Sequence, residues 1–255
     1  MLINEANFRK VSEELREKNV TLVAVSKTKP VEAIRELYDL GQRDFGENYV
    51  QELISKKDQL PADIRWHFIG HLQSNKAKLL VPFVHLIHGI DSFKLLNEVN
   101  KAATRAGRVQ DVLLQVHIAS EETKFGLDDG ELEALMKEKE SKSLQFIKLS
   151  GFMGMASFTE DKEKVRREFR TLRMIADVYG LPILSMGMSG DYQVAVEEGS
   201  NMVRIGSLLF GERNKTLYKA RNFDFRRRIA GAGQRLSGAF RPLPPGLACF
   251  FNLYG

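Results

Sequence analysis

The sequence alternates short apolar, β-branched runs with segments of helical periodicity, and this alternation repeats eight times before residue 212. The expected strands are residues 21–27, 44–48, 65–70, 85–91, 111–119, part of 144–157, 183–189 and 202–210. Helices are expected at residues 30–41, 49–57, 74–80, 92–106, 128–139, 161–179 and 191–198, with an additional amphipathic helix at about 3–18. Strands that alternate with helices pair in parallel, and eight such units predict an α/β fold, a single (β/α)8 TIM barrel.

An open, doubly wound sheet is the alternative architecture for eight such strands. The nucleotides that bind to open sheets usually require a G-x-G-x-x-G turn after an early strand or a G-x-x-x-x-G-K-[ST] loop, and neither motif occurs at such a place in this chain. The closed barrel is therefore favoured.

Charge divides the chain at about residue 212. Residues 213–255 contain nine Lys and Arg against one acid, Asp224, so that segment carries a net charge of +8, while residues 1–212 carry −3. Residues 1–212 are expected to form the barrel, and residues 213–255 a basic tail that is disordered or loosely docked. Binding of nucleic acid or another polyanion through this tail is an alternative function, but it is disfavoured because few aromatic residues interleave the charges.

Composition also bears on the cellular compartment. Cys249 is the only cysteine, which excludes an intrachain disulfide and a cysteine-based metal cluster. No run approaches the ~18 apolar residues that a membrane-spanning helix needs, and the N-terminal segment has no apolar core of signal-peptide length. The expectation is a cytoplasmic protein without a membrane partner, either a monomer or a weak dimer.

The segment TLVAVSKTKP places Lys27 directly after an apolar run. A buried ammonium is costly unless it is paired, neutralised or used chemically. Arg204 also interrupts an apolar strand, in MVRIGS, and the first and last strands of a closed barrel are neighbours. Two adjacent buried cations repel each other unless an anion lies between them or the lysine is uncharged. A phosphate-bearing aldehyde meets both conditions, because Lys27 can condense with it as a Schiff base. The alternative is a strand-end lysine whose ammonium simply reaches solvent.

Two glycine-containing turns near the ends of the last two strands are candidates for holding the phosphate. They are Ser189–Gly190 and Gly206–Ser207, whose backbone N–H groups can donate to an anion without adding charge. Barrels often bind phosphate beside their last two strands, which makes these positions informative.

Six segments in fixed order carry a resemblance to a known family: VAVSKTKP, FGENYVQE, WHFIGHLQSNK, GFMGMAS, LSMGMSGDYQVAVEEGS and NMVRIGSLLFGER. Together they resemble the pyridoxal 5′-phosphate homeostasis protein family, once called proline synthase co-transcribed homologues, from about residue 22 to residue 213. The resemblance implies a barrel like the N-terminal domain of alanine racemase, with pyridoxal 5′-phosphate (PLP) on Lys27. It further implies that Arg204 faces the pyridine nitrogen, that Ser189, Gly206 and Ser207 hold the phosphate, and that Asn48 lies near the ring. Family members usually end soon after the FGER motif, whereas this chain continues.

The same residues favour a carrier over an enzyme. An arginine that faces the pyridine nitrogen leaves the ring neutral, which weakens the electron sink that PLP enzymes use. A racemase also needs two acid/base groups on opposite faces of its substrate, and in alanine racemases, which this barrel resembles, the second comes from an additional β domain. The chain is therefore expected to hold PLP as a Schiff base and to deliver it to apo-enzymes in PLP homeostasis, with no catalytic residue. A weak PLP-dependent amino-acid racemase is the main alternative.

Several other residues receive simpler interpretations. His67 and His71 are four apart in a predicted strand, not on the helix that a metal pair of this spacing requires, so no metal site is expected and one of them is interpreted as structural or adjacent to PLP. Lys29 is expected at the surface or on the phosphate side. Four methionines, Met153, Met155, Met186 and Met188, are expected to fill the core beneath the ligand pocket.

Overall fold

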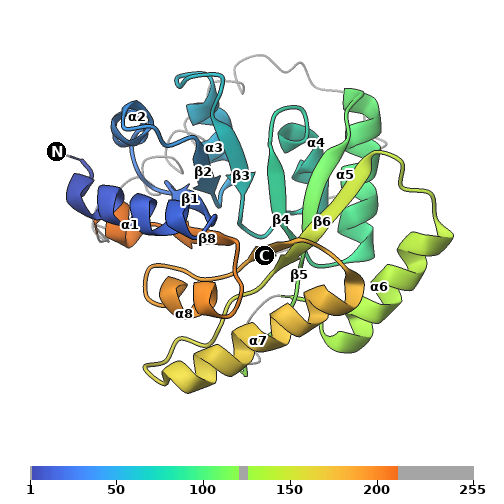
Figure 1. Ribbon diagram of the computed structural model, residues 1–255. Helices are drawn as coiled ribbons and strands as arrows, with labels where there is room; N and C mark the ends of the chain where they lie inside the picture. The colour runs from blue at the N-terminus through green and yellow to red at the C-terminus, as the bar shows by residue number, and fades with distance from the viewer. Residues whose placement is uncertain (1, 121–125, 212–255) are drawn as a thin grey trace, which may run out of the picture. The chain divides into compact units, whose positions relative to one another are not determined.

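A computed structural model of the chain describes residues 2–120 and 126–211. Within these residues eight parallel strands close in chain order into a barrel, and helices cover its outside (Figure 1). The strands are β1 (Thr21–Val25), β2 (Asp44–Glu47), β3 (Arg65–Phe68), β4 (Leu86–Ile90), β5 (Gln110–Gln115), β6 (Ile147–Met153), β7 (Ile183–Ser185) and β8 (Met202–Ile205). The predicted (β/α)8 barrel is confirmed.

The helices follow the predicted order. They are α1 (Glu5–Glu17), α2 (Val31–Asp39), α3 (Val50–Lys57), the short 3₁₀ helix η1 (Ser74–Lys76), α4 (Ala77–Leu80), α5 (Phe93–Ala106), α6 (Asp129–Ser141), α7 (Lys162–Tyr179), α8 (Tyr192–Glu197) and α9 (Ser207–Phe210). The predicted N-terminal helix is present as α1, and Asn4 at its start donates its backbone N–H to Leu209 O at 2.7 Å. The predicted basic tail, residues 213–255, lies outside the described residues and stays a prediction.

Local sequence signals explain where many of these helices begin and end. The side chains of Ser92, Asp128 and Asp161 accept backbone hydrogen bonds at the starts of α5, α6 and α7. Gly107 and Gly180 end α5 and α7 with φ near +64°, a conformation that favours glycine. Both helices end at the predicted residue.

All eight strands end before the predicted residue, and three of these ends matter for the site. β1 ends at Val25, β7 at Ser185 and β8 at Ile205, although apolar residues follow within a few positions of β7 and β8. The segment SLLF after β8 is helical rather than extended, and it buries Leu209 and Phe210 against the core. The chain therefore leaves the barrel earlier than predicted, which places the predicted site residues other than Arg204 after the strands, at the carboxyl rim.

The interior of the barrel is only partly apolar. Val23, Leu86, Leu113, Met153 and Met202 form one buried cluster inside it. Polar or charged strand residues are also buried, among them Asp44, His67, His88, Ser185 and Arg204. Branched aliphatic side chains dominate the interior of most such barrels, so this polar set requires a separate explanation.

The prediction for the methionines is correct in part. Met153 and Met186 are buried, and Met155 packs partly buried against the inner cluster. Met188 is 37 % exposed, so its prediction as core filling is wrong. It lies beyond the end of β7, in a loop that leaves the barrel. No helix within the described ranges is both long enough and apolar enough to cross a membrane.

Candidate functional site

The predicted site residues come from four consecutive strands of the closed barrel. β7 pairs with β8, β8 with β1, and β1 with β2. Lys27 and Asn48 follow β1 and β2, Ser189 and Gly190 follow β7, Arg204 lies in β8, and Gly206 and Ser207 follow β8. The fold thus brings to one side of the barrel residues that lie up to 180 positions apart in the chain.

Lys27 lies in a tight turn just after β1 rather than in the strand, and it is half-buried. The Lys29 N–H donates to Ser26 O at 3.0 Å, which closes a four-residue turn. Thr28, the third residue of this turn, has φ +65°, a conformation that a β-branched residue rarely adopts and that costs on the order of 1–3 kcal/mol. Other contacts must stabilise this turn.

Helix α3 supplies those contacts on both sides of Lys27. The Lys56 ammonium donates to Ser26 O at 2.9 Å, and the Thr28 N–H donates to Glu52 Oε1 at 2.6 Å. These two groups belong to the peptide units immediately before and after Lys27. These two hydrogen bonds hold the backbone on both sides of Lys27, and we call them the clamp. The backbone position from which the Lys27 side chain extends is therefore fixed.

A buried charge cluster anchors this clamp. The Lys56 side chain also donates to Glu47 Oε1 and Glu52 Oε1, each at 2.7 Å, and Ser26 Oγ donates to Glu47 Oε1 at 2.7 Å. Burial has the largest effect on Glu47 and raises its pKa to about 7, although the Lys56 ammonium opposes the shift. Glu52 and Lys56 are four apart on α3 and can be paired from sequence, but the participation of Glu47 depends on the fold.

Replacing Lys56 with methionine is expected to lower the free energy of unfolding by about 3–5 kcal/mol, because Glu47 would keep a buried carboxyl group without its cation. The measurement is urea denaturation followed by circular dichroism. Lys57→Met is the matched control on the same helix, since Lys57 is more exposed and pairs with the exposed Asp58; its loss should stay within about 0.5 kcal/mol. A loss below about 1 kcal/mol for Lys56→Met would contradict the clamp.

Asn48 presents an unused acceptor at the rim. Its Oδ1 is buried and has no hydrogen-bond partner among the described residues. Gly70, just after β3, packs against its backbone, and a Cβ on Gly70 would lie 2.2 Å from Asn48 O. A buried amide oxygen without a partner is costly in a folded protein, so it marks a place where a ligand can donate a hydrogen bond.

Arg204 is buried, with 4 % of its surface exposed. Its guanidinium donates to Ser185 O at 2.6 Å, to Ser185 Oγ at 2.7 Å and to Gly154 O at 3.0 Å. Burial lowers its pKa to about 10, although the charge of Asp191 opposes the shift, so the group stays charged at neutral pH. No carboxylate lies within ion-pair distance of it in the described part of the chain. Arg204 is thus a buried cation that neutral oxygens hold in place.

The two glycine-containing turns lie against each other, as the phosphate prediction requires. The Gly206 N–H donates to Ser189 Oγ at 3.3 Å, which joins the loop after β7 to the start of α9. Gly190 and Ser207 are exposed. Asp191 also lies in this region and accepts a hydrogen bond from the Met188 N–H. An anion bound here would lie near one carboxylate as well as near the backbone donors.

Lys29, which was expected at the surface or on the phosphate side, contacts the end of α9. It is partly buried, and its ammonium donates to Phe210 O at 2.8 Å and to Gly211 O at 3.2 Å. These contacts join the loop after β1 to the end of α9. Lys27 and Lys29 therefore differ in role although only one residue separates them.

His67 and His71, the two histidines considered in the sequence analysis, lie in different environments. His67 is buried inside the barrel, whereas His71 lies beyond β3, is exposed and contacts Asp91 at 3.1 Å. Sequence reasoning missed Asp44 and His88, which contact His67, and Ser185, which contacts His88. Their common signal is the period of two along each strand, which places them on the inward face.

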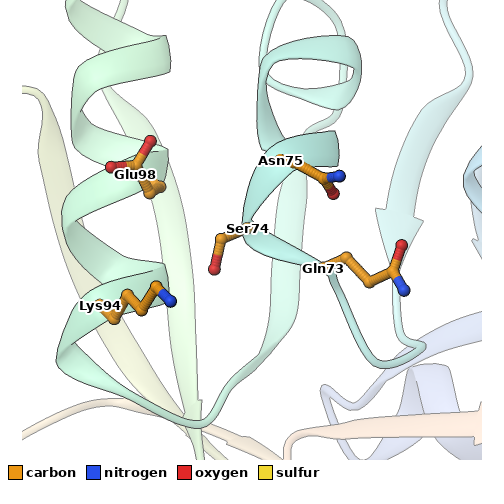
Figure 2. A pocket seen from close by; sticks show the side chains of 5 residues that line it. All are labelled: Gln73, Ser74, Asn75, Lys94 and Glu98. Carbon is orange, nitrogen blue, oxygen red and sulfur yellow. The ribbon is translucent and has the colours of Figure 1, made fainter. Parts of the chain in front are cut away.

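A polar hollow of about 540 Å³ lies apart from these residues, between η1 and α5. Figure 2 shows Lys94 and Glu98 on α5 facing the turn that carries Ser74. Gln73 and Asn75 complete the lining. None of the predicted site residues lines this hollow, so it does not coincide with the site at the rim.

Comparisons with known proteins agree with the fold and with the predicted family. The alanine racemase N-terminal domain family matches residues 4–214. The pyridoxal phosphate homeostasis protein of Aquifex aeolicus is 45% identical over 199 residues, which cover 75% of this chain and 86% of that protein. The human protein of the same name is 42% identical over 213 residues, 76% of each chain.

Solved structures give the same result. PipY of Synechococcus elongatus, solved without PLP, superposes with a TM-score of 0.76 at 36% identity and covers 81% of this chain and 99% of its own. PipY with PLP bound gives a TM-score of 0.73 at 37% identity, over 80% of this chain and 99% of PipY. An alanine racemase from Clostridium difficile is similar in fold alone, with a TM-score of 0.66 at 15% identity over 84% of this chain and 58% of the racemase.

Proposed function

Because the chain belongs to the pyridoxal phosphate homeostasis protein family, we propose that it binds PLP through Lys27 and serves to hold and release this cofactor. The observation that supports the proposal is the placement of three residues on adjacent strands. Lys27, whose backbone the clamp holds, follows β1; the buried Arg204 lies in β8; and Asn48, whose Oδ1 has no partner among the described residues, follows β2. Apo-enzymes that require PLP are the proposed recipients.

The residues present fit the polar groups of PLP. Asn48 Oδ1 can accept a hydrogen bond from a ring substituent, and the buried Arg204 cation can donate to the pyridine nitrogen. Backbone donors of the Ser189–Gly190 and Gly206–Ser207 turns would hold the phosphate. When bound, PLP supplies an aldehyde that condenses with a primary amine with loss of water, and the resulting bond absorbs visible light. Lys27 supplies the amine.

The surroundings of Lys27 favour exchange of a bound group over turnover. Lys27 is half-buried, and Gly190 and Ser207 are exposed, so water and incoming amines can reach this rim. Arg204 is a permanent donor and cannot supply the carboxylate that keeps a pyridine nitrogen protonated. Glu47 and Glu52, whose carboxylates contact the residues on either side of Lys27, are held by Lys56. A carrier that lacks robust catalysis is therefore the proposed role.

The test is a titration of the purified protein with PLP, followed by transfer. We expect a visible absorption band that borohydride abolishes, and reactivation of an apo PLP-dependent enzyme by the loaded protein after unbound PLP has been removed by gel filtration. A protein that shows no visible band at saturating PLP would contradict binding, and a loaded protein that never reactivates the apo-enzyme would contradict delivery. Polyanion binding through residues 213–255 stays a separate prediction.

A further inference from the structure

A chain of hydrogen-bonded side chains runs through the interior of the barrel. It begins at Asp44, the first residue of β2, whose carboxylate accepts a hydrogen bond from Arg65 Nε at 2.7 Å. Arg65 is half exposed, so this end of the chain is near solvent. Asp44 Oδ1 lies 3.0 Å from His67 Nε2 on β3, and His67 Nδ1 lies 2.9 Å from His88 Nε2 on β4.

The chain then crosses the barrel. His88 Nδ1 lies 2.9 Å from Ser185 Oγ, although β4 and β7 are not neighbours in the sheet. Ser185 Oγ in turn accepts a hydrogen bond from Arg204 at 2.7 Å. A continuous set of contacts therefore joins the buried cation of the proposed PLP site to a carboxylate at the amino end of the barrel.

Hydrogen-bond chemistry assigns a single direction to this chain. An ionised Asp44 can only accept, so His67 must donate from Nε2, and a neutral His67 must then accept at Nδ1. His88 must therefore donate from Nε2 and accept at Nδ1, which requires the Ser185 hydroxyl to donate. Ser185 Oγ remains able to accept from Arg204. With two neutral imidazoles, the Asp44 end of the chain thus sets this arrangement. The Arg204 end is compatible with it, because Ser185 Oγ can accept from Arg204 while its hydroxyl donates to His88.

Burial and charge agree with this arrangement. His67, His88 and Ser185 each expose at most 1 % of their surface. Burial, together with the nearby Arg204 cation, lowers the pKa of His88 well below its usual value. Burial raises the pKa of Asp44, but the hydrogen bonds from His67 and Arg65 outweigh this effect and lower it to about 2. The imidazole of His88 is therefore neutral at pH 7, and the carboxylate of Asp44 is ionised.

We propose that Asp44, His67, His88 and Ser185 form a one-directional relay that provides a distant counter-charge for Arg204, in addition to the Asp191 carboxylate. Each dipole points its negative end toward Arg204, so the relay stabilises the guanidinium where no carboxylate touches it. Its four members are positioning residues, since they act on the cofactor through Arg204. The link to PLP rests on the proposed function, whereas the direction of the relay does not.

The first experiment uses the protein without PLP. Nitrogen-15 NMR of protein labelled at histidine distinguishes the two neutral tautomers, and at pH 7 both His67 and His88 are expected to carry their proton on Nε2. His67→Gln and His88→Gln variants assign the signals. A proton on Nδ1 of either neutral ring, or a charged ring at pH 7, would overturn the proposed direction whether or not the protein binds PLP.

The second experiment removes the charge at the far end. Asp44→Asn keeps an acceptor for His67 but loses the negative charge, and it should raise the dissociation constant for PLP about tenfold. It should also shift the NMR signal of the pyridine nitrogen of bound nitrogen-15 PLP, which a purely structural role would leave unchanged. His85→Asn is the matched control, because His85 is exposed and its ring lies 5.4 Å from that of His67 outside the relay. Its dissociation constant should stay within about twofold of wild type.

Ser185→Ala is a second test of the relay, which can be used if the Asp44→Asn variant does not fold. This change breaks the relay next to Arg204 without altering charge, while the Ser185 carbonyl still accepts from the guanidinium. A folded variant of either kind that binds PLP like wild type, with an unshifted pyridine signal, would overturn the relay. Failure of wild type to bind PLP would instead contradict the proposed function, and the tautomers would still test the relay.

Discussion

Replacing Lys27 with alanine is expected to abolish the borohydride-reducible adduct with PLP while the barrel stays folded. The side chain is half-buried, and the contacts that hold its turn use the backbone of Ser26 and Thr28. Removing the side chain therefore leaves the clamp intact, and the free energy of unfolding should change by about 0.5 kcal/mol or less. Absorbance before and after borohydride measures the adduct, and urea denaturation measures stability.

Lys29→Ala is the matched control for this experiment. Lys29 lies in the same segment, but its ammonium donates to Phe210 O and Gly211 O. This variant should keep the adduct. Its free energy of unfolding should fall by about 1–3 kcal/mol, because the carbonyl groups of Phe210 and Gly211 lose a hydrogen-bond donor. Peptide mapping of the reduced protein should place the label on Lys27 in wild type. An undiminished adduct in Lys27→Ala, with the label on another lysine, would show that the site is wrongly assigned.

The barrel could be predicted because its signals are local and repeated. Each strand and helix can be recognised within about ten residues, and glycines such as Gly107 and Gly180 end helices for conformational reasons that do not depend on the fold. Strand ends were less predictable. The segment SLLF after β8 is as apolar as a strand, and only its packing as α9 decides its conformation.

The candidate site was predictable to the extent that its residues interrupt apolar runs. Lys27 and Arg204 stand out in this way, and the closed barrel places their strands side by side. The relay was not predictable, because the contact between His88 and Ser185 joins residues 97 positions apart across the interior. The ion pair between Glu52 and Lys56 could be predicted, because the two residues are four apart on one helix. The ion pair between Glu47 and Lys56 could not, because it joins a strand to that helix.

Arg204→Gln should weaken PLP binding by roughly ten- to one-hundredfold, because a charged hydrogen bond of about 1.5–3 kcal/mol is lost. Glutamine is shorter than arginine and cannot reach Ser185 and Gly154 together, so some stability is lost as well. Equilibrium dialysis measures binding, and a thermal melt verifies folding. Arg170→Gln is the control, since Arg170 is an exposed arginine that pairs with Glu198 on the outside of the barrel. Binding by Arg204→Gln that equals wild type would exclude Arg204 from the site.

Arg204→Glu addresses the absence of catalysis rather than affinity. A carboxylate at this position can hold a proton on the pyridine nitrogen, which strengthens the electron sink that the arginine weakens. With PLP saturating, this variant should therefore exchange the α-proton of L-alanine in D₂O faster than wild type, as NMR would show. Wild type itself should exchange slowly and produce little D-alanine. Racemisation by wild type at about 1 per second or faster would contradict the carrier role and establish the racemase alternative, because that rate lies in the range of ordinary enzymes.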